Sequence, residues 1–406
     1  MSQEEKNFQV IREIEHTRVH GELIGKIASS FCYVDEETLI DDLASDLDKH
    51  KEIFELAVLS EGNEVEGIII RRDFTETLSK PYARDVYKHK KVRRLMKLSR
   101  KIDYRENIFA LVEDFKDTMN QVGILSFILT RNKNQYFGIF TNRDLLLYLS
   151  SITQKDISLA RKLQQSLVSE EKQVHKDGIE IYAASHMAKE VGGDFYYMKK
   201  YTKTNWTLSV CDVSGKGVSA SLVTTLLSGT FEIYDFTKGI REYVRRINGF
   251  IHQSFEHDKF VTGIIIDLNE ETGEIELMDM GHSYIYIIRN GKMHHLEYKN
   301  QNLPIGVDEI GNDDQENYKS IRYQLQPDDI LMLLTDGIPE QSNQDNEEYG
   351  IKRLSALLKA ETLKESSLKQ IKNAVFEDLN RYRSGVPIHD DFTLMLIRWE
   401  NPKAKN

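Results

Sequence analysis

Cys-Asp-Val-Ser-Gly-Lys-Gly, at Cys211–Gly217, is the stretch that decides how the second half of this chain folds. An apolar run precedes it and a helix-like pattern follows it, so its aspartate lies where a strand is expected to end. Three further motifs resemble it: Val191–Asp194 (Val-Gly-Gly-Asp), Thr335–Gly337 (Thr-Asp-Gly) and His389–Thr393 (His-Asp-Asp-Phe-Thr). In each, aspartate borders an apolar run, and in all but the last a glycine is close by. This pattern is typical of strand ends beside tight turns.

Carboxylates placed at such turns can converge on one point. Several unpaired carboxylates packed together repel one another, and a hard divalent cation such as Mg²⁺ or Mn²⁺ removes that repulsion by taking oxygen ligands. Two such ions would form a hydrolytic centre that acts on phosphate. Any one of the motifs alone is more typical of an ordinary turn, so the prediction depends on the ordered set of four.

The ordered set resembles the metal-dependent serine/threonine protein phosphatases of the PPM family, in the bacterial branch of SpoIIE-type regulators. The resemblance covers residues 173–400. It implies an α-β-β-α sandwich, in which two sheets are flanked by helices, with two Mn²⁺ or Mg²⁺ ions in a cleft at one edge of the sheets. Asn290-Gly291, between two apolar runs, independently predicts a hairpin with a type I′ turn.

The resemblance also implies the residues that surround the ions: Asp194, Asp212, Val213, Asp336, Asp390 and Asp391. Asp212 would bridge both ions, with the backbone carbonyl of Val213 completing one shell, and Asp336 and Asp390 would ligate the other ion. Asp194 would approach directly or through water, as a catalytic residue alongside Asp212. Asp391 would orient the ligands or bind a third ion. Lys216 departs from the family pattern, because many relatives carry histidine there.

Bulk properties predict a cytoplasmic protein of two or three domains. The chain has 406 residues, and its net charge of −11 argues against nucleic acid as the main partner. No apolar stretch approaches the eighteen residues that a membrane span needs, and the polar start of the sequence lacks a signal-peptide core. Cys32 and Cys211 lack any disulfide or metal-binding spacing, so both are expected to be reduced core residues.

The first half contains an internal repeat over residues 21–150, after an N-terminal helix expected at 1–20. Phe54–Leu59 and Gly67–Phe74 form the strands and turn of the first copy, and Ile124–Leu129 and Gly138–Leu146 those of the second. Each copy has the order helix, strand, turn, strand, helix, which predicts a pseudo-symmetric module. The module resembles a CBS-domain pair, which implies a regulatory site for an adenosine nucleotide.

The two copies differ at the positions that hold nucleotides in relatives. Those positions carry a hydroxyl residue and, three residues later, an aspartate; Thr141 and Asp144 match in the second copy, whereas the first has Ile70 before Asp73. One competent nucleotide site is therefore expected rather than two. The alternative is that Asp73 and Asp144 only cap the helices that follow them.

A helical linker is expected between the two halves, over residues 151–172. Residues 143–172 contain neither glycine nor proline, and Leu149, Ile152, Leu159 and Leu163 follow a three-four spacing. The end of this segment resembles the linker that precedes SpoIIE-type domains. Its apolar stripe could pack on the phosphatase core or on a second chain, and a homodimer is expected.

These observations predict an α+β protein that acts as a metal-dependent protein serine/threonine phosphatase. In relatives the substrate is often a phosphorylated anti-sigma-factor antagonist of the STAS type. The competing hypothesis is a non-catalytic nucleotide-sensing scaffold that has a phosphatase-like fold. Retention of all the expected aspartates argues against it, since a scaffold would not require them.

Overall fold

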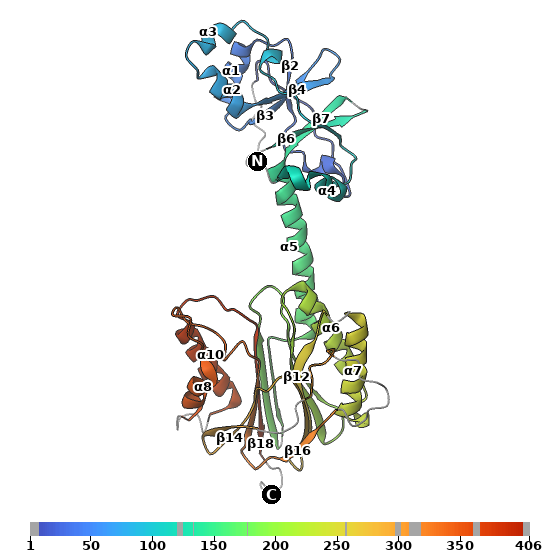
Figure 1. The fold of residues 1–406 in the computed structure, drawn as a ribbon, viewed down its shortest axis with the longest axis vertical. Coiled ribbons are helices and arrows are strands. Elements are labelled where there is room, and N and C mark those ends of the chain that lie inside the picture. Colours follow the sequence, from blue (N-terminus) through green and yellow to red (C-terminus); the bar gives the residue numbers. More distant parts are fainter. Residues whose placement is uncertain are drawn as a thin grey trace. The chain divides into compact units, whose positions relative to one another are not determined.

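The computed structural model describes residues 8–119, 125–132, 134–176, 178–255, 258–296, 302–307, 318–359 and 366–400 (Figure 1). The chain divides into two compact units, residues 1–154 and 155–406. The division falls inside the long helix α5 (Asn142–Leu167), so no separate linker domain lies between the units. Among the described residues, no helix combines the length and apolar character needed to cross a bilayer.

The first unit contains the repeat predicted from the sequence. One sheet has the order β1-β2-β3-β4 and the other β5-β6-β7. In each copy the first strand runs parallel to the second (β2 to β3, β5 to β6), and the second is antiparallel to the third. Both copies shift register at the same place, at Val58/Leu59 and at Leu129/Thr130. This topology confirms the repeat, whereas its assignment to the CBS family stays a prediction.

The elements of the first unit are β1 (Arg12–Glu13), η1 (Ile24–Ile27), β2 (Cys32–Asp35), α1 (Ile40–Lys49), β3 (Glu55–Leu59), β4 (Val65–Ile70), α2 (Arg71–Leu78), α3 (Ala83–Tyr87), η2 (Val92–Arg94), β5 (Lys101–Asp103), α4 (Ile108–Met119), β6 (Ser126–Arg131) and β7 (Gln135–Thr141).

The N-terminal segment corrects one prediction. Residues 8–20 form no helix and contain only the short strand β1. The buried carboxylate of Asp46 accepts hydrogen bonds from the backbone N–H groups of Gln9, Val10 and Ile11 at 2.7–3.2 Å. Backbone N–H groups bound to a side chain in this way are unavailable for helical hydrogen bonds, so the segment is held extended.

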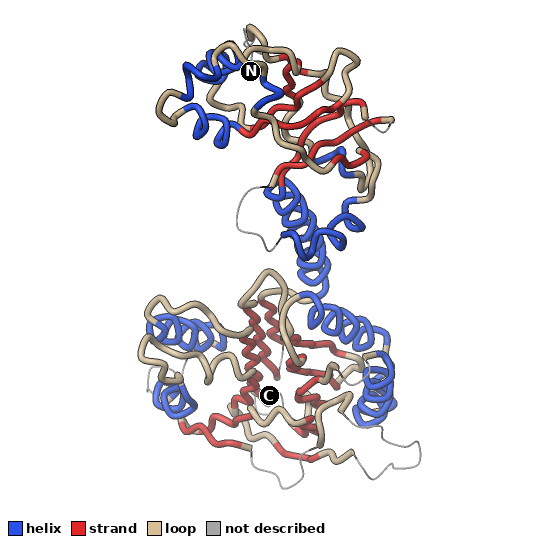
Figure 2. The backbone as a smooth tube through the Cα atoms, turned by 45° about the horizontal axis from the view of Figure 1, so that its top comes forward, coloured by secondary structure: helices blue, strands red, loops and turns tan. Residues whose placement is uncertain are grey.

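The second unit is a sandwich of two antiparallel sheets with helices outside both (Figures 1 and 2). The five-stranded sheet has the order β10-β11-β12-β13-β16 and contacts α6 and α7, and the six-stranded sheet has the order β15-β14-β17-β18-β9-β8 and contacts α8 and α10. The arrangement agrees with the α-β-β-α sandwich expected from the sequence.

The elements of the second unit are β8 (Glu171–Lys176), β9 (Ile179–His186), β10 (Asp194–Lys200), β11 (Asn205–Val213), α6 (Val218–Ile233), η3 (Phe236–Lys238), α7 (Ile240–Ser254), β12 (Val261–Asn269), β13 (Glu274–Met280), β14 (Ile285–Arg289), β15 (Lys292–His295), β16 (Ile321–Gln324), β17 (Ile330–Leu334), α8 (Gly350–Leu358), α10 (Leu368–Arg383) and β18 (Phe392–Trp399).

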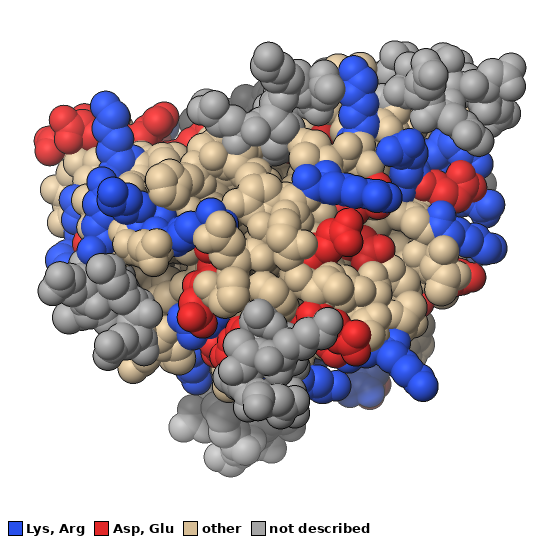
Figure 3. Space-filling view, turned by 90° about the horizontal axis from the view of Figure 1, so that it is seen from below, with Lys and Arg blue, Asp and Glu red and all other residues tan. Residues whose placement is uncertain are grey.

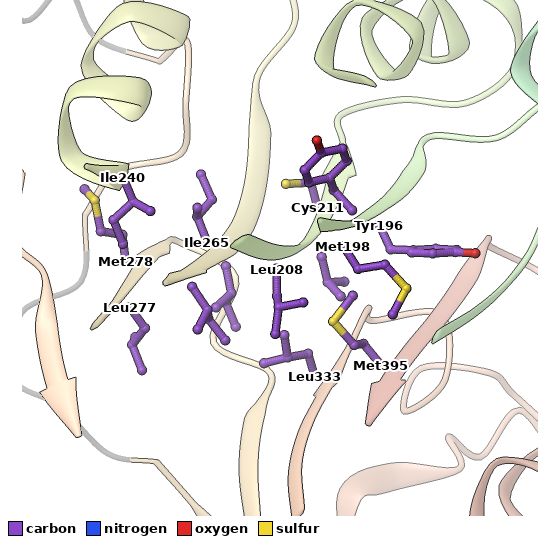
Figure 4. Close-up of a cluster of buried hydrophobic side chains, with 14 of the residues drawn as sticks. Tyr196, Met198, Leu208, Cys211, Ile240, Ile265, Leu277, Met278, Leu333 and Met395 are labelled. Atoms are coloured by element: carbon purple, nitrogen blue, oxygen red, sulfur yellow. The ribbon is translucent and has the colours of Figure 1, made fainter. Parts of the chain in front are cut away.

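The core of this unit lies between the two sheets. Leu208 from β11 faces Leu333 from β17, and Met198 from β10 lies beside Met395 from β18 (Figure 4). All four side chains are buried, and burial of each is worth roughly 1.5–3 kcal/mol. Cys211 belongs to the same cluster and is a free thiol, as expected from the sequence. This packing fixes the strand ends that carry the acidic motifs.

The structure corrects the expected end of one helix, adds a strand that was not predicted, and confirms one hairpin. The helix expected over 143–172 ends at Leu167, because residues from Glu171 onward pair with β9 as strand β8. Strand β16 was also missed. Strand β8 is polar and largely exposed, so it lacks the apolar alternation that marks a strand. Strand β16 does alternate in burial, but its four residues are too few to stand out in the sequence. The predicted hairpin is confirmed, since Asn290 and Gly291 have φ of 51° and 67°.

Charged side chains on the face shown in Figure 3 are mixed in sign. Lys and Arg are scattered among Asp and Glu there and form no continuous basic area among the described residues.

Candidate active site

The four acidic motifs meet at one end of the sandwich. Asp194 begins β10 and lies directly opposite Asp212, near the end of β11, in the antiparallel ladder. Asp336 follows the end of β17 in the six-stranded sheet. Asp391 immediately precedes β18, which pairs with β17 in that sheet. Together with Asp390 these residues form what we call the acidic cluster: Asp194, Asp212, Asp336, Asp390 and Asp391. The structure therefore brings together every aspartate that the sequence placed at the metal site.

Burial and mutual repulsion perturb the acidic cluster. Burial, followed by the charges of Asp336, Asp390 and Asp391, raises the pKa of Asp212 to about 7. Burial, with Glu340 and Asp390 nearby, raises the pKa of Asp336 to about 6. Asp194 is 2% exposed, and its burial beside Asp212 and Asp391 raises its pKa well above the usual range. Carboxylates that repel one another in this way favour a cation among them.

Hydrogen bonds fix two of the carboxylates. Oδ1 of Asp391 accepts from the backbone N–H of Ala188 at 2.7 Å, and Oδ2 accepts from that of Gly193 at 2.6 Å. The hydroxyl of Thr335 donates to Oδ2 of Asp194 at 2.7 Å and accepts from the backbone N–H of Thr393 at 2.8 Å. Thr335 thus ties Asp194, in one sheet, to β18, in the other. Thr335 lies within one of the four motifs, and nothing in the sequence pattern indicates this role.

Lys216 supplies a cation to the acidic cluster. Its Nζ lies 2.7 Å from Oδ2 of Asp390 and donates to the carbonyl of His389 at 2.8 Å. The hydrogen bond to Asp390 raises the pKa of Lys216. This residue therefore joins the Ser214–Gly217 loop to the C-terminal motif, where the sequence offered only a departure from the family pattern.

Two glycines give the backbone room at the site. A Cβ on Gly193 would lie 2.9 Å from the carbonyl oxygen of Val213 and 3.5 Å from Oδ1 of Asp212. A Cβ on Gly337 would lie 2.0 Å from the carbonyl oxygen of Asp391. Side chains at these positions would fill the space beside the oxygen atoms of the acidic cluster, so the motifs require glycine for steric reasons.

The chemistry of this site suits a hard divalent cation, because its donors are carboxylate and backbone carbonyl oxygens. Among the described residues, however, no three His, Cys, Asp or Glu side chains are arranged to hold a metal ion. The hydrogen bonds explain this: Asp391 is held toward Ala188 and Gly193, Asp194 toward Thr335, and Asp390 toward Lys216. The donor types fit, and loading the site would require the Lys216–Asp390 pair to separate.

Histidine takes no evident part in the acidic cluster. His282 is buried, its Nε2 lies 2.8 Å from the carbonyl oxygen of Leu334, and burial lowers its pKa. A neutral imidazole bonded to the end of β17 supports the loop that carries Asp336. These contacts give His282 a structural role.

The predicted nucleotide-binding pair lies in the first unit. The hydroxyl of Thr141 accepts from the backbone N–H of Asp144 at 3.2 Å, while Oδ2 of Asp144 accepts from the backbone N–H of Thr141 at 2.8 Å. These reciprocal bonds form a capping box at the start of α5, which supports the capping alternative. Both residues also line a cavity of about 510 Å³, so the two roles are compatible.

Asp73, the counterpart of Asp144 in the first copy, has different partners. Lys97 lies 2.7 Å from its Oδ2 and Arg72 lies 3.2 Å from its Oδ1. The hydrogen bond from Lys97 lowers the pKa of Asp73. Asp73 does not line the cavity that contains Thr141 and Asp144. The inequality of the two copies expected from the sequence is thus visible in their contacts.

Comparison with known proteins shows which proteins the second unit resembles. Residues 202–400 match the family model described as stage II sporulation protein E (SpoIIE). The SiaA-PP2C domain of Pseudomonas aeruginosa superposes with a TM-score of 0.51 at 18% identity, covering 62% of this chain and 99% of that domain. The second unit therefore has the PP2C fold, and residues 202–400 within it are similar to SpoIIE-type domains.

Two further proteins are similar to part of this chain. The phosphoserine phosphatase RsbP of Bacillus subtilis (strain 168) is 25% identical over 193 residues, which are 46% of this chain and 45% of RsbP. The chain therefore spans less than half the length of that relative. The PP2C domain of SpoIIE from Bacillus subtilis, solved with a fragment of its regulatory domain, has a TM-score of 0.46 at 19% identity and covers 55% of this chain and 65% of that one.

The raised pKa of Asp212 predicts how the stability of the metal-free protein depends on pH. Its folded pKa of about 7 exceeds its ordinary value of 3.8, so between these values the folded state binds a proton that the unfolded state does not. The free energy of unfolding should therefore fall as pH rises from about 4 to about 7. Thermal unfolding in chelator should show a lower Tm at pH 7.5 than at pH 5.5.

The Asp212→Asn variant is the control for this pH dependence. It lacks the titrating carboxyl, so its Tm should fall less over the same interval. Mn²⁺ should raise the wild-type Tm more at pH 7.5 than at pH 5.5, because deprotonated carboxylates bind metal better. Equal slopes for wild type and variant would contradict the perturbed pKa of Asp212.

Proposed function

We propose that this protein is a protein serine/threonine phosphatase that depends on Mn²⁺ or Mg²⁺. The observation that carries the proposal is the acidic cluster, in which four separate motifs place five carboxylates at one end of a PP2C fold. The similarity to a phosphoserine phosphatase over 193 residues supports it. Two ions are proposed, as the family resemblance implies.

Each residue of the cluster has a proposed role. Asp212, with the carbonyl of Val213 beside it, and Asp336 and Asp390 would hold the ions, and Asp194 and Asp391 would complete the site. When bound, the ions would lower the pKa of water at the site and neutralise the phosphoryl oxygens. The chain contributes orientation: Thr335 fixes Asp194, and the N–H groups of Ala188 and Gly193 fix Asp391.

Hydrolysis of a small phosphoester tests the proposal. The full chain, stripped of metal, should release phosphate from p-nitrophenyl phosphate only after Mn²⁺ or Mg²⁺ is added. A matched assay with a phosphoserine peptide should show the same metal dependence. The competing hypothesis, a nucleotide-sensing scaffold without catalysis, predicts no release above background at any metal concentration.

The physiological substrate is proposed to be a phosphorylated protein of the STAS type. This part rests on the resemblance to SpoIIE-type regulators. Release of phosphate from a serine-phosphorylated STAS protein, at a rate well above that for an unrelated phosphoprotein, would support it. Equal rates for the two proteins would contradict it.

The first unit is proposed to be a CBS-like regulatory module that binds an adenosine compound in the cavity beside Thr141. Among the described residues, Arg143 is the one basic residue that lines this cavity. Four carboxylates also line it: Glu13, Glu52, Glu55 and Asp144. Burial and the charge of Asp144 raise the pKa of Glu55. Carboxylates accept hydrogen bonds from ribose hydroxyls and repel phosphates, so the cavity favours adenosine or AMP over ATP.

Calorimetry tests the ligand of this cavity. Adenosine or AMP should bind about once per chain, and ATP should bind more weakly. Thr141→Ala combined with Asp144→Ala should abolish the binding, and Asp73→Ala serves as the matched control because it lies outside the cavity. Absence of binding at millimolar concentration would show that the module does not take this class of ligand.

A homodimer is proposed through the exposed leucines of α5. Leu159, Leu163 and Leu167 recur every fourth residue and are 59%, 55% and 47% exposed. A stripe of this spacing on one helix is self-complementary, so a second copy is the proposed occupant. Light scattering should give twice the chain mass, and Leu159→Glu with Leu163→Glu should give the monomer. A wild-type monomer at high micromolar concentration would contradict the proposal.

A further inference from the structure

Lys216 and a metal ion would compete for the same carboxylate. Oδ1 of Asp390 accepts from the backbone N–H of Asp391 at 2.9 Å, and Oδ2 lies 2.7 Å from Nζ of Lys216. The side chains of Lys216 and Asp390 are 43% and 40% exposed, so the pair lies at the solvent side of the acidic cluster. An ammonium and a divalent cation repel each other strongly at such short range. Lys216 must therefore leave Asp390 when a cation binds there.

The loop that carries Lys216 is held by contacts that do not involve its side chain. The backbone N–H of Ser214 donates to the carbonyl of Phe260 at 2.9 Å, and the hydroxyl of Ser214 accepts from the backbone N–H of Phe260 at 2.9 Å. At the other end of the loop, the carbonyl of Gly217 accepts from the backbone N–H of Ser221 in α6 at 3.0 Å. The flexible side chain of Lys216 can therefore change its partner while the loop keeps its place.

Because the loop is held, the ammonium of Lys216 stays within reach of the cluster after it leaves Asp390. Burial raises the pKa of Asp212 and of Asp336, and the charge of Lys216 lowers both in part, so this charge already acts on two other motifs. A phosphoryl group held at the cluster would bring negatively charged oxygens to the same place. A lysine ammonium has three donors and binds phosphate as a compact charge. A phosphoryl oxygen can therefore replace the carboxylate as the partner of Lys216.

We propose that Lys216 is a substrate-binding residue whose ammonium exchanges Asp390 for the phosphoryl group of the substrate. It pairs with Asp390 until a divalent cation takes that carboxylate, and it then binds a phosphoryl oxygen. Two consequences of opposite sign follow, because Lys216 opposes metal binding and favours phosphate binding. A lysine that only anchored its loop would favour both. The inference rests on the proposed metal-dependent function.

Calorimetric titration of Mn²⁺ into the full chain tests the first consequence without an assay of activity. Lys216→Met keeps most of the length of the side chain and removes the ammonium. The variant should bind Mn²⁺ about 2-fold to 5-fold more tightly than wild type, the size expected when an exposed ion pair no longer competes. The matched control is Lys203→Met, which removes an exposed lysine from the connection between β10 and β11, at the end of that hairpin away from Asp194 and Asp212. It should bind Mn²⁺ like wild type.

Inorganic phosphate, titrated into the full chain at saturating Mg²⁺, tests the second consequence. Lys216→Met should bind phosphate about 10-fold more weakly, the order expected for one lost hydrogen bond to a charged group. The KM for p-nitrophenyl phosphate should rise by a similar factor while kcat changes much less, because an ammonium that binds the substrate and the transition state alike affects KM alone. Lys216→Arg keeps the positive charge and should restore both phosphate binding and KM to near the wild-type values.

The outcomes separate the inference from the function on which it rests. If the wild type binds Mn²⁺ and hydrolyses the phosphoester, but Lys216→Met binds Mn²⁺ equally or more weakly, Lys216 does not oppose the metal and the inference is wrong. Unchanged phosphate binding in Lys216→Met would overturn it as well. If the wild type binds no Mn²⁺, the proposed function fails and the inference fails with it. Should Lys216→Met not fold, Lys216→Gln also removes the charge and must show the same two opposite changes.

Discussion

The Asp212→Ala variant is expected to lose at least about 10³-fold in turnover, the order of loss seen when a member of a catalytic constellation is removed. Asp212 stands opposite Asp194, and the charges of Asp336, Asp390 and Asp391 all act on it. It is therefore the carboxylate closest to the centre of the cluster. Without Asp212, the two ions would lose the carboxylate that is proposed to ligate both of them. Phosphate release at saturating Mn²⁺ measures the loss.

Stability separates loss of the site from loss of the fold. Removing a repelled, half-buried carboxylate should raise the Tm of the metal-free protein at pH 7.5, so the variant is expected to fold. Asp345→Ala, which removes an exposed carboxylate from a loop, should keep both wild-type turnover and wild-type Mn²⁺ dependence. Full activity of Asp212→Ala at saturating Mn²⁺ would remove the basis of the proposed site.

Convergence of the aspartates was predictable from sequence because each borders an apolar run that becomes a buried strand. The partners of those aspartates were not predictable. Lys216 and Asp390 are 174 positions apart and meet only because of the order of strands in the sandwich. Pairing of β9 with β18 brings the Val191–Asp194 turn to the C-terminal motif in the same way. Such pairings depend on sheet order, which local patterns do not encode.

Helix α5 shows a different limit of sequence reasoning. Its periodicity correctly indicated that Leu159 and Leu163 share a face, and packing on the catalytic domain was one of two roles considered for that face. The structure leaves these leucines exposed and buries Gln164. Periodicity reports which residues lie together, whereas the face that meets a domain depends on the partner surface. In this structure that surface includes the backbone N–H and carbonyl of Gly192, which form hydrogen bonds with an amide and could not do so with an apolar side chain.

Polar segments were the weakest part of the fold prediction. The strands of the internal repeat were evident because they are apolar, whereas β8 is polar and largely exposed and β16 has only four residues. The segment 8–20 was expected to be helical and is instead held by Asp46, whose position 35 to 37 residues away no local pattern reveals. Asp46 and the partner of β16, strand β13, lie far along the chain, whereas β8 pairs with its immediate neighbour β9 and was hidden by its polar composition.

Gly337→Ala is the second substitution with a large expected effect. The added Cβ would lie 2.0 Å from the carbonyl oxygen of Asp391 and 3.2 Å from Cβ of Phe392. The start of β18 must then move, and with it Asp390 and Asp391. Overpacking of this kind costs about 1–3 kcal/mol or more. Denaturant unfolding should show that loss, and Mn²⁺-dependent hydrolysis should fall further than the loss of folded protein explains.

The matched control for Gly337→Ala is Gly229→Ala. Gly229 lies within α6, and a Cβ there would meet no atom within 4 Å. Alanine in a helix interior is more stable than glycine by roughly 0.5–1 kcal/mol, so the free energy of unfolding should rise and the hydrolysis rate should stay at the wild-type value. The same chemical change thus has opposite expected effects at the two positions, because only Gly337 lies against the backbone that carries the cluster. If Gly337→Ala were as stable and active as Gly229→Ala, close contact between the Thr335–Gly337 motif and the start of β18 would not be required for the site.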